Sequence, residues 1–201
     1  MTGALAAIGA SCHSPPSTVE WPKPATLAGV ATLDGVAADP RDGLADSLAV
    51  VVFISNDCPI SNALAPELCA LATHASDRGI AFYAVHANPP ADLALVSTHA
   101  NEYGLTNAMT VLVDPEQSLA RATGAKVMPE AVLFRRGANK EVTILYIGRV
   151  NDLYSALGRR RASPTRNDLR DAIDAAHAGG APAQSKTKAI GCFIEMSPTA
   201  G

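Results

Sequence analysis

The segment Leu48–Ser55 places the tightest constraint on the fold. Its first seven residues, Leu48–Ile54, are all apolar and mostly β-branched, which predicts a strand buried on both faces of a sheet. The run is far shorter than the ~20 apolar residues that a membrane-spanning helix needs. We therefore expect a domain built around a central strand whose two faces are both covered.

The rest of the chain alternates between helical and strand patterns. Apolar residues at 64, 68, 71 and 72 share one face of a helix that begins near Pro59 and ends before Gly79. The other expected elements, in chain order, are a hairpin at 27–35, a strand at 80–87, a helix at 90–103, a strand at 110–113, a helix at 115–123, a strand pair at 131–134 and 142–147, and a helix at 164–178. This order predicts an α/β fold with a central mixed β-sheet flanked by helices on both faces.

Composition and end segments suggest the domain limits and the partners. With 16 basic and 19 acidic residues the net charge is −3, so we expect no nucleic-acid partner. Residues 1–20 are expected to be a leader or a disordered N-terminus, 21–178 the folded domain, and 179–201 a C-terminal tail that carries Cys192.

The leader bears on localisation. The apolar run Gly3–Ala10 resembles the end of an export signal, and Cys12 stands where a lipoprotein would carry its lipid. We therefore expect an exported protein, periplasmic or membrane-anchored, with no transmembrane span. The alternative is an alanine-rich leader on a cytoplasmic protein.

Cys58 is the residue whose position best suits chemistry. It follows the buried strand and directly precedes Pro59, which suits the first position of a helix because no N–H donor is needed there. Free N–H groups and the helix dipole at such a position stabilise a thiolate and lower its pKa. The alternative is a buried structural cysteine.

From about residue 25 to 178 the chain resembles the redoxin branch of the thioredoxin-like superfamily. The strand–Cys58–helix unit is one shared feature, and Pro66 falls where thioredoxins have a helix-kinking proline. Met128-Pro129, just before a strand, resembles the cis-proline turn that faces the active-site cysteine in this superfamily. The resemblance implies a thioredoxin-like fold and a groove for a partner's cysteine, shaped by Met128 and Pro129.

Departures from the known patterns narrow the function. Ser61 stands where a Cys-x-x-Cys reductase has its second cysteine. Peroxiredoxins share a hydroxyl residue at Ser55, but Val51 replaces their proline, and the arginine expected near Pro129 or Glu130 is missing. Copper-carrying relatives have two cysteines near the helix start and a later histidine, whereas Cys58 stands alone at the helix start of this chain.

The remaining candidates include a second thiol and a basic segment. The sequence Gly191-Cys192 in the tail resembles a bacterial redoxin subgroup, which implies that Cys192 has a role. We expect Cys69 to pack as a small hydrophobe and His86 to be a wall residue. Five arginines between 159 and 170 predict a solvated surface or, alternatively, a docking patch for an acidic partner.

The sequence thus predicts a thiol–disulfide redox protein. In this hypothesis Cys58 is the nucleophile and Cys192 the resolving cysteine, with no cofactor and no metal, and the partner is a protein thiol or disulfide or a small-molecule thiol. The active-site support is expected from Ser55, Asn56, Pro59, Ser61, Met128 and Pro129. The alternatives are an atypical thiol peroxidase and a non-enzymatic module that binds copper or a partner through Cys58, Cys192 and a histidine.

Overall fold

A computed structural model describes residues 19–20, 27–89, 92–138 and 141–197. Its seven-stranded mixed sheet has the order β1-β8-β7-β3-β4-β5-β2. The strands β3, β4 and β5 are parallel, and all other neighbours in this sheet are antiparallel. The strands of this sheet are β1 (Val19–Glu20), β2 (Ala31–Thr32), β3 (Leu48–Ile54), β4 (Ala81–His86), β5 (Thr110–Val113), β7 (Glu130–Arg136) and β8 (Val142–Gly148).

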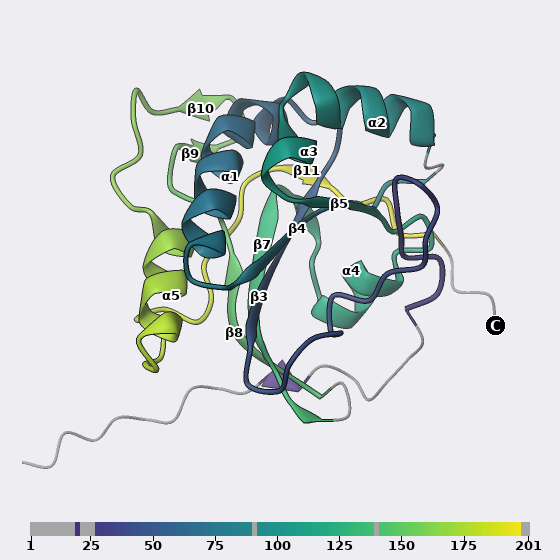
Figure 1. Cartoon of the computed structure of the whole chain (residues 1–201). Coiled ribbons are helices and arrows are strands. Elements are labelled where there is room, and N and C mark those ends of the chain that lie inside the picture. The colour runs from purple at the N-terminus through teal and green to yellow at the C-terminus, as the bar shows by residue number, and fades with distance from the viewer. Residues whose placement is uncertain (1–18, 21–26, 90–91, 139–140, 198–201) are drawn as a thin grey trace, which may run out of the picture.

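Helices cover both faces of this sheet, as the sequence predicts (Figure 1). Helices α1 (Pro59–Ser76), α2 (Leu93–Glu102), α3 (Leu105–Ala108) and α5 (Asp168–His177) lie on one side. The short helix α4 (Ser118–Thr123) lies on the other side. The mixed α/β architecture with helices on both faces is therefore confirmed.

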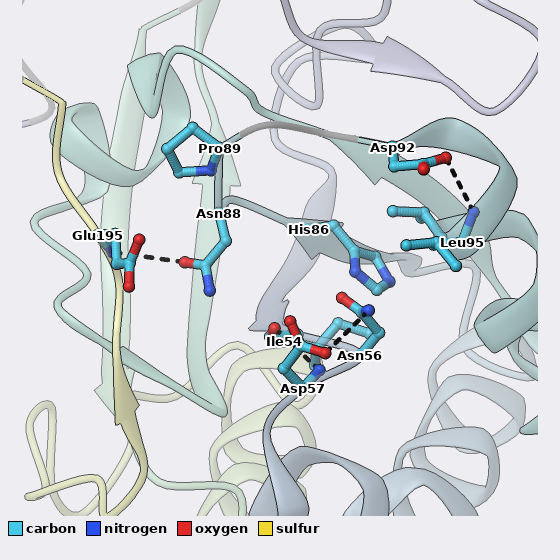
Figure 2. Close-up of a pocket in the computed structure, with 11 residues that line it drawn as sticks. Ile54, Asn56, Asp57, His86, Asn88, Pro89, Asp92, Leu95 and Glu195 are labelled. Atoms are coloured by element: carbon cyan, nitrogen blue, oxygen red, sulfur yellow. Dashed lines mark hydrogen bonds between the residues drawn. The ribbon is translucent and has the colours of Figure 1, made fainter.

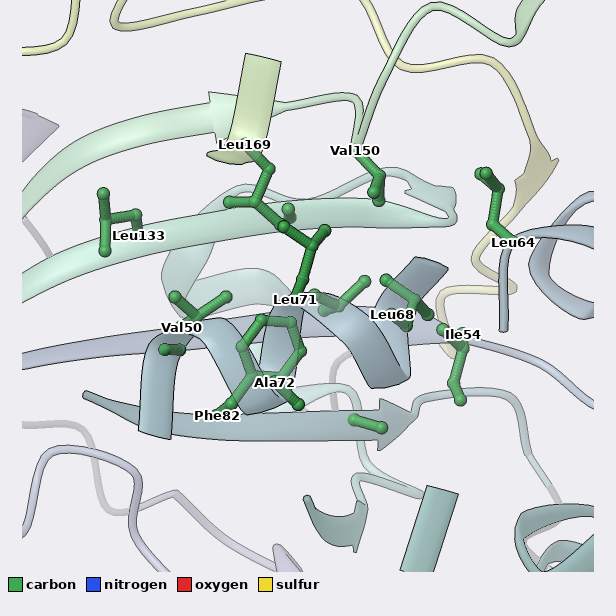
Figure 3. Packing of buried hydrophobic residues seen from close by; sticks show 14 of the residues in the cluster. Val50, Ile54, Leu64, Leu68, Leu71, Ala72, Phe82, Leu133, Val150 and Leu169 are labelled. Atoms are coloured by element: carbon green, nitrogen blue, oxygen red, sulfur yellow. The ribbon is translucent and has the colours of Figure 1, made fainter. Parts of the chain in front are cut away.

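The alternation of side chains along β3 divides the core into two halves. Val50, Val52 and Ile54 face α1 and α5, where Leu68, Leu71 and Leu169 are fully buried (Figure 3). The intervening residues of β3 face α4 and the C-terminal segment. All seven residues of β3 are buried, so this strand fixes the position of whatever follows its end.

Two local expectations differ from the structure. The hairpin expected at 27–35 lies slightly later in the chain. Ala31 forms an antiparallel bridge with Ala37, and the Ala38 amide donates to the Val30 carbonyl at 3.0 Å, while Ala31–Thr32 also pairs with β5. The last helix begins at Asp168 rather than near 164. Thr165 is unavailable as its cap, since its amide and hydroxyl both bind the Asp152 carboxylate at 2.6 Å.

Two small sheets complete the fold. A hairpin joins β9 (Tyr154–Ala156) to β10 (Arg159–Arg160), and β6 (Val127–Met128) pairs with β11 (Cys192–Phe193) near the C-terminus. The chain after α5 runs back across the sheet to make this pairing (Figure 1). Among the described residues, none of the helices is long and apolar enough to cross a membrane.

Candidate active site

Cys58 lies at the junction between the central strand and the longest helix. It is the N-cap residue of α1, with extended backbone angles, and Pro59 occupies the first helical turn. The residue has no exposed surface, and its thiol donates a hydrogen bond to the carbonyl oxygen of Met128 at 3.1 Å. The end of β3 and the start of α1 thus hold this sulfur against the β6 segment.

The turn before β7 supplies the opposite wall. The Met128–Pro129 peptide bond is cis, and both residues are buried. Met128 contacts both cysteines. Its carbonyl oxygen accepts the hydrogen bond from the Cys58 thiol, and it is paired with Cys192 in the β6–β11 ladder. Cys58, Met128 and Cys192 therefore meet at one point.

The tail reaches this point through a series of backbone contacts. Thr187 and Ser185 bond to Ile147 in β8, and the Ile194 amide bonds to the Lys126 carbonyl at 3.0 Å. The Thr187 hydroxyl also bonds to the Tyr146 hydroxyl at 2.6 Å. These contacts on both sides of Cys192 hold it at the site.

The two cysteines, both free thiols here, perturb each other. Burial acts to raise the pKa of Cys58, but hydrogen bonds from Cys192 and Ser61 outweigh it and leave this pKa below its ordinary value. Burial, together with the hydrogen bond and the charge of Cys58, raises the pKa of Cys192 to about 11. The pair therefore favours a thiolate at Cys58 and a protonated thiol at Cys192.

The polar residues predicted to support the site lie around the start of α1. Within the described residues the buried Ser61 hydroxyl has no other hydrogen-bond partner, so a Cys58 thiolate is the acceptor available to it. Ser55 accepts a hydrogen bond from the Asp57 amide at 3.2 Å, and the Asn56 carbonyl accepts one from the Asn62 side chain at 3.0 Å. Ser55 and Asn56 thus shape the loop, whereas Ser61 bears directly on the sulfur.

Other candidates lie apart from the thiol pair. The Cys69 thiol contacts the carbonyl oxygens of Tyr103 and Gly104, and burial raises its pKa. Arg149 lies in a shallow hollow beside Pro129, but Asp168 holds its guanidinium at 2.7 Å. Within the described part of the chain, no group of three or more His, Cys, Asp or Glu residues is arranged to hold a metal ion. Cys12 lies outside the described residues.

Two residues that shape the site, Gly191 and Thr187, were not predicted from the sequence to do so. A Cβ atom at Gly191 would lie 1.9 Å from the Met128 carbonyl oxygen, so the approach of the tail requires glycine there. Thr187 is the second, since its hydroxyl also accepts a hydrogen bond from the Arg149 amide at 3.0 Å. The Gly-Cys pair was a signal for the first, but nothing local marks Thr187.

Comparison with known proteins gives structural matches only. No family model and no curated protein matches the chain. The fold is similar to an uncharacterized conserved protein from Geobacillus kaustophilus, at a TM-score of 0.71 and 25% identity over 85% of this chain and 89% of that one. It is also similar to a hypothetical protein from Sinorhizobium meliloti 1021, at a TM-score of 0.64 and 27% identity over 77% and 82% of the two chains.

A third similar structure is a secreted Mycobacterium tuberculosis disulfide oxidoreductase described as homologous to E. coli DsbE. Its TM-score is 0.49 and its identity 21%, over 74% of this chain and 92% of that one. In the present chain, a parallel strand–helix–strand unit, with a cysteine at the helix start, packs beside an antiparallel pair preceded by a cis-proline. This arrangement is a thioredoxin-like fold.

Proposed function

We propose that the protein is a thiol–disulfide oxidoreductase in which Cys58 is the nucleophile and Cys192 the resolving cysteine. The observation that carries the proposal is the β6–β11 ladder, which holds Cys192 opposite Met128 while the Met128 carbonyl contacts the Cys58 thiol. The thiol missing from the position of Ser61 is thereby supplied from the other end of the chain.

The opposed pKa shifts support a particular order for the two steps. The Cys58 thiolate attacks one sulfur of a partner disulfide, forms a mixed disulfide and releases the first partner sulfur as a thiolate, which takes a proton from water. Cys192 then attacks Cys58, and its proton passes to the second partner sulfur as that sulfur leaves. The partner gains two electrons and two protons, and the chain ends with a Cys58–Cys192 disulfide.

The contacts between Cys58 and Cys192 also influence when Cys192 can attack. In the resting pair, the hydrogen bond and the charge of Cys58 help to keep the pKa of Cys192 at about 11. Burial is the largest cause of this shift and persists in the mixed disulfide, but Cys58 then carries no charge, so its contribution is lost and the pKa of Cys192 falls. Cys192 is thus a better nucleophile when there is a mixed disulfide to resolve.

Met128, Pro129 and the start of α1 would support these steps. The Ser61 hydroxyl and amide stabilise the Cys58 thiolate, and Pro59 suits the first helical turn because no N–H donor is needed there. Ser55 and Asn56 fix the loop that carries Cys58. A protein thiol or disulfide is the partner class that this chemistry fits, in an exported location such as the leader sequence suggests.

Insulin reduction in the presence of dithiothreitol tests the proposal, with a hydroperoxide assay alongside it. We expect Cys58→Ser to abolish insulin reduction and Cys192→Ser to trap a mixed disulfide with a model disulfide substrate. The matched control is Cys69→Ser, which should behave like the wild type. Full activity of Cys58→Ser, or hydroperoxide turnover without insulin reduction, would contradict the proposal.

A further inference from the structure

A cavity of about 360 Å³ lies beside the loop that precedes Cys58, and neither cysteine lines it. It opens between the end of β3, the end of β4, the start of α2 and the tail (Figure 2). Its polar lining includes Asp57, His86, Asp92 and Glu195. Its volume falls within the range of small-molecule sites.

The charges of this cavity are all of one sign. Asp57, Asp92 and Glu195 line it, and among the described residues no lysine or arginine does. Burial, with a smaller contribution from His99, lowers the pKa of His86 to about 3, so this imidazole is neutral at physiological pH. A concave surface with carboxylates and no cation attracts positive ligands.

The hydrogen bonds that the three carboxylates make in the structure leave them able to bind a ligand. One oxygen of Asp92 accepts the Ala94 and Leu95 amides at the start of α2. Asp57 accepts from the Asn56 side chain at 3.2 Å, and Glu195 is tied to the Asn88 side chain only through its own amide. In the described part of the chain, no ion pair neutralises any of the three.

His86 is a second, independent sign of a ligand. It is only 3% exposed, and its buried Nε2 has no hydrogen-bond partner among the residues that the structure describes. Its ring projects toward the Asn56 and Leu95 side of the cavity (Figure 2). A buried polar atom without a partner destabilises the fold, so an N–H donor that reached this ring would offset that cost.

We propose that this cavity binds a small organic cation that carries primary ammonium groups on an alkyl chain. The ammonium groups would pair with the carboxylates and donate to His86, while the apolar wall of Ile54, Leu95 and Val96 would pack against the methylene groups. A metal ion fits less well, because no three potential ligands in the described residues are arranged to hold one.

Calorimetric titration of the reduced full-length chain tests this site with three probes of equal length. Cadaverine has two ammonium groups, aminopentanol has one and pentanediol has none. We expect affinity to fall in that order, with the diol not binding. Equal binding of diol and diamine, or no binding of the diamine, would overturn the proposal.

Two conservative variants locate the binding. Asp92→Asn keeps the side-chain oxygen that caps α2, and Glu195→Gln changes an exposed side chain, so both should fold normally. Each should weaken cadaverine binding about fivefold or more, as expected for loss of one charged hydrogen-bond partner. Glu102→Gln, at the opposite end of α2 and outside the cavity, is the control and should bind as the wild type does.

The thiol chemistry and the cavity are separable in the same titration. Because Cys58 does not line the cavity, Cys58→Ser should bind cadaverine with unchanged affinity. If neither carboxylate variant weakens binding, the cation binds elsewhere and the assignment of this cavity is wrong.

Discussion

The α-carbon of Gly191 faces the carbonyl oxygen of Met128 so closely that a methyl group would lie 1.9 Å from that oxygen. The same carbonyl accepts the hydrogen bond from the Cys58 thiol. The absence of one side chain in the tail therefore permits the contact that brings Cys192 to the nucleophilic cysteine, and this contact can be tested without altering either thiol.

Gly191→Ala should separate the two cysteines. The added methyl group collides with the backbone of Met128, which cannot yield as a flexible side chain would, so β11 must move away from β6. We expect disulfide formation between Cys58 and Cys192 to slow about tenfold or more, because the reacting atoms lose their alignment. Timed oxidation, acid quenching and mass spectrometry of the alkylated thiols measure this rate.

Gly180→Ala is the matched control, since a Cβ atom there would be 3.4 Å from the Ala175 carbonyl oxygen, an ordinary contact. It should oxidise at the wild-type rate. Wild-type oxidation of Gly191→Ala would mean that the β6–β11 pairing is not what brings the thiols together.

Cys192→Ala should raise the pKa of Cys58. The side-chain hydrogen bond from Cys192 opposes the effect of burial, and its loss leaves burial less compensated. Cys192→Ser keeps a donor and should cause a smaller shift, while Cys58→Ala should bring the pKa of Cys192 down from about 11. Ultraviolet absorbance of the thiolate against pH reports each value, and an unchanged Cys58 pKa in Cys192→Ala would contradict the assigned contact.

The parts of the site that depend on local sequence could be predicted. The apolar β3 segment and Pro59 place Cys58 at a helix start, and Met128-Pro129 before a strand places the opposing turn. These features involve residues adjacent in the chain, so hydrophobic pattern and proline geometry are sufficient to find them.

The pairing of the tail could not be predicted in the same way. β11 has only two residues, and its register against β6 depends on contacts between segments more than sixty residues apart. The cavity beside the Cys58 loop was missed for a similar reason, because Asp57, His86 and Glu195 come from three distant segments. Their positions follow from the folded sheet rather than from any local spacing.

Thr187→Val should loosen the tail. The hydroxyl bonds to the Tyr146 hydroxyl at 2.6 Å and accepts from the Arg149 amide at 3.0 Å, and valine removes both bonds at nearly equal volume. We expect a loss of about 1–3 kcal/mol in the free energy that holds the tail in place. Faster hydrogen exchange at 185–194 would show it, with Thr98→Val on the exposed face of α2 as the control.

Cys58 should be alkylated well before Cys69 at neutral pH. Hydrogen bonds favour the thiolate at Cys58, whereas burial raises the pKa of Cys69 and its thiol contacts the Tyr103 and Gly104 carbonyls. Because Cys58 is itself buried, the comparison should be made with a small reagent such as iodoacetamide. Equal alkylation rates for the two cysteines across pH would contradict the assignment of Cys58 as the reactive thiol.

His86 should make the fold sensitive to acid. Burial lowers its pKa to about 3, below the ~6.5 of an unfolded histidine, so in mild acid the unfolded chain takes up a proton that the folded chain does not. The resulting stability is complete above pH 6.5 and is lost as the pH falls from there toward 3. Between pH 7 and pH 5 this one group should lower the free energy of unfolding by about 2 kcal/mol.

Urea unfolding of two variants at both pH values tests this. The His86→Gln variant should no longer show this decrease in the free energy of unfolding. The His177→Gln variant, which changes an exposed histidine at the end of α5, should still show it. An equal loss of stability in wild type and His86→Gln would show that His86 does not stay neutral in the folded protein.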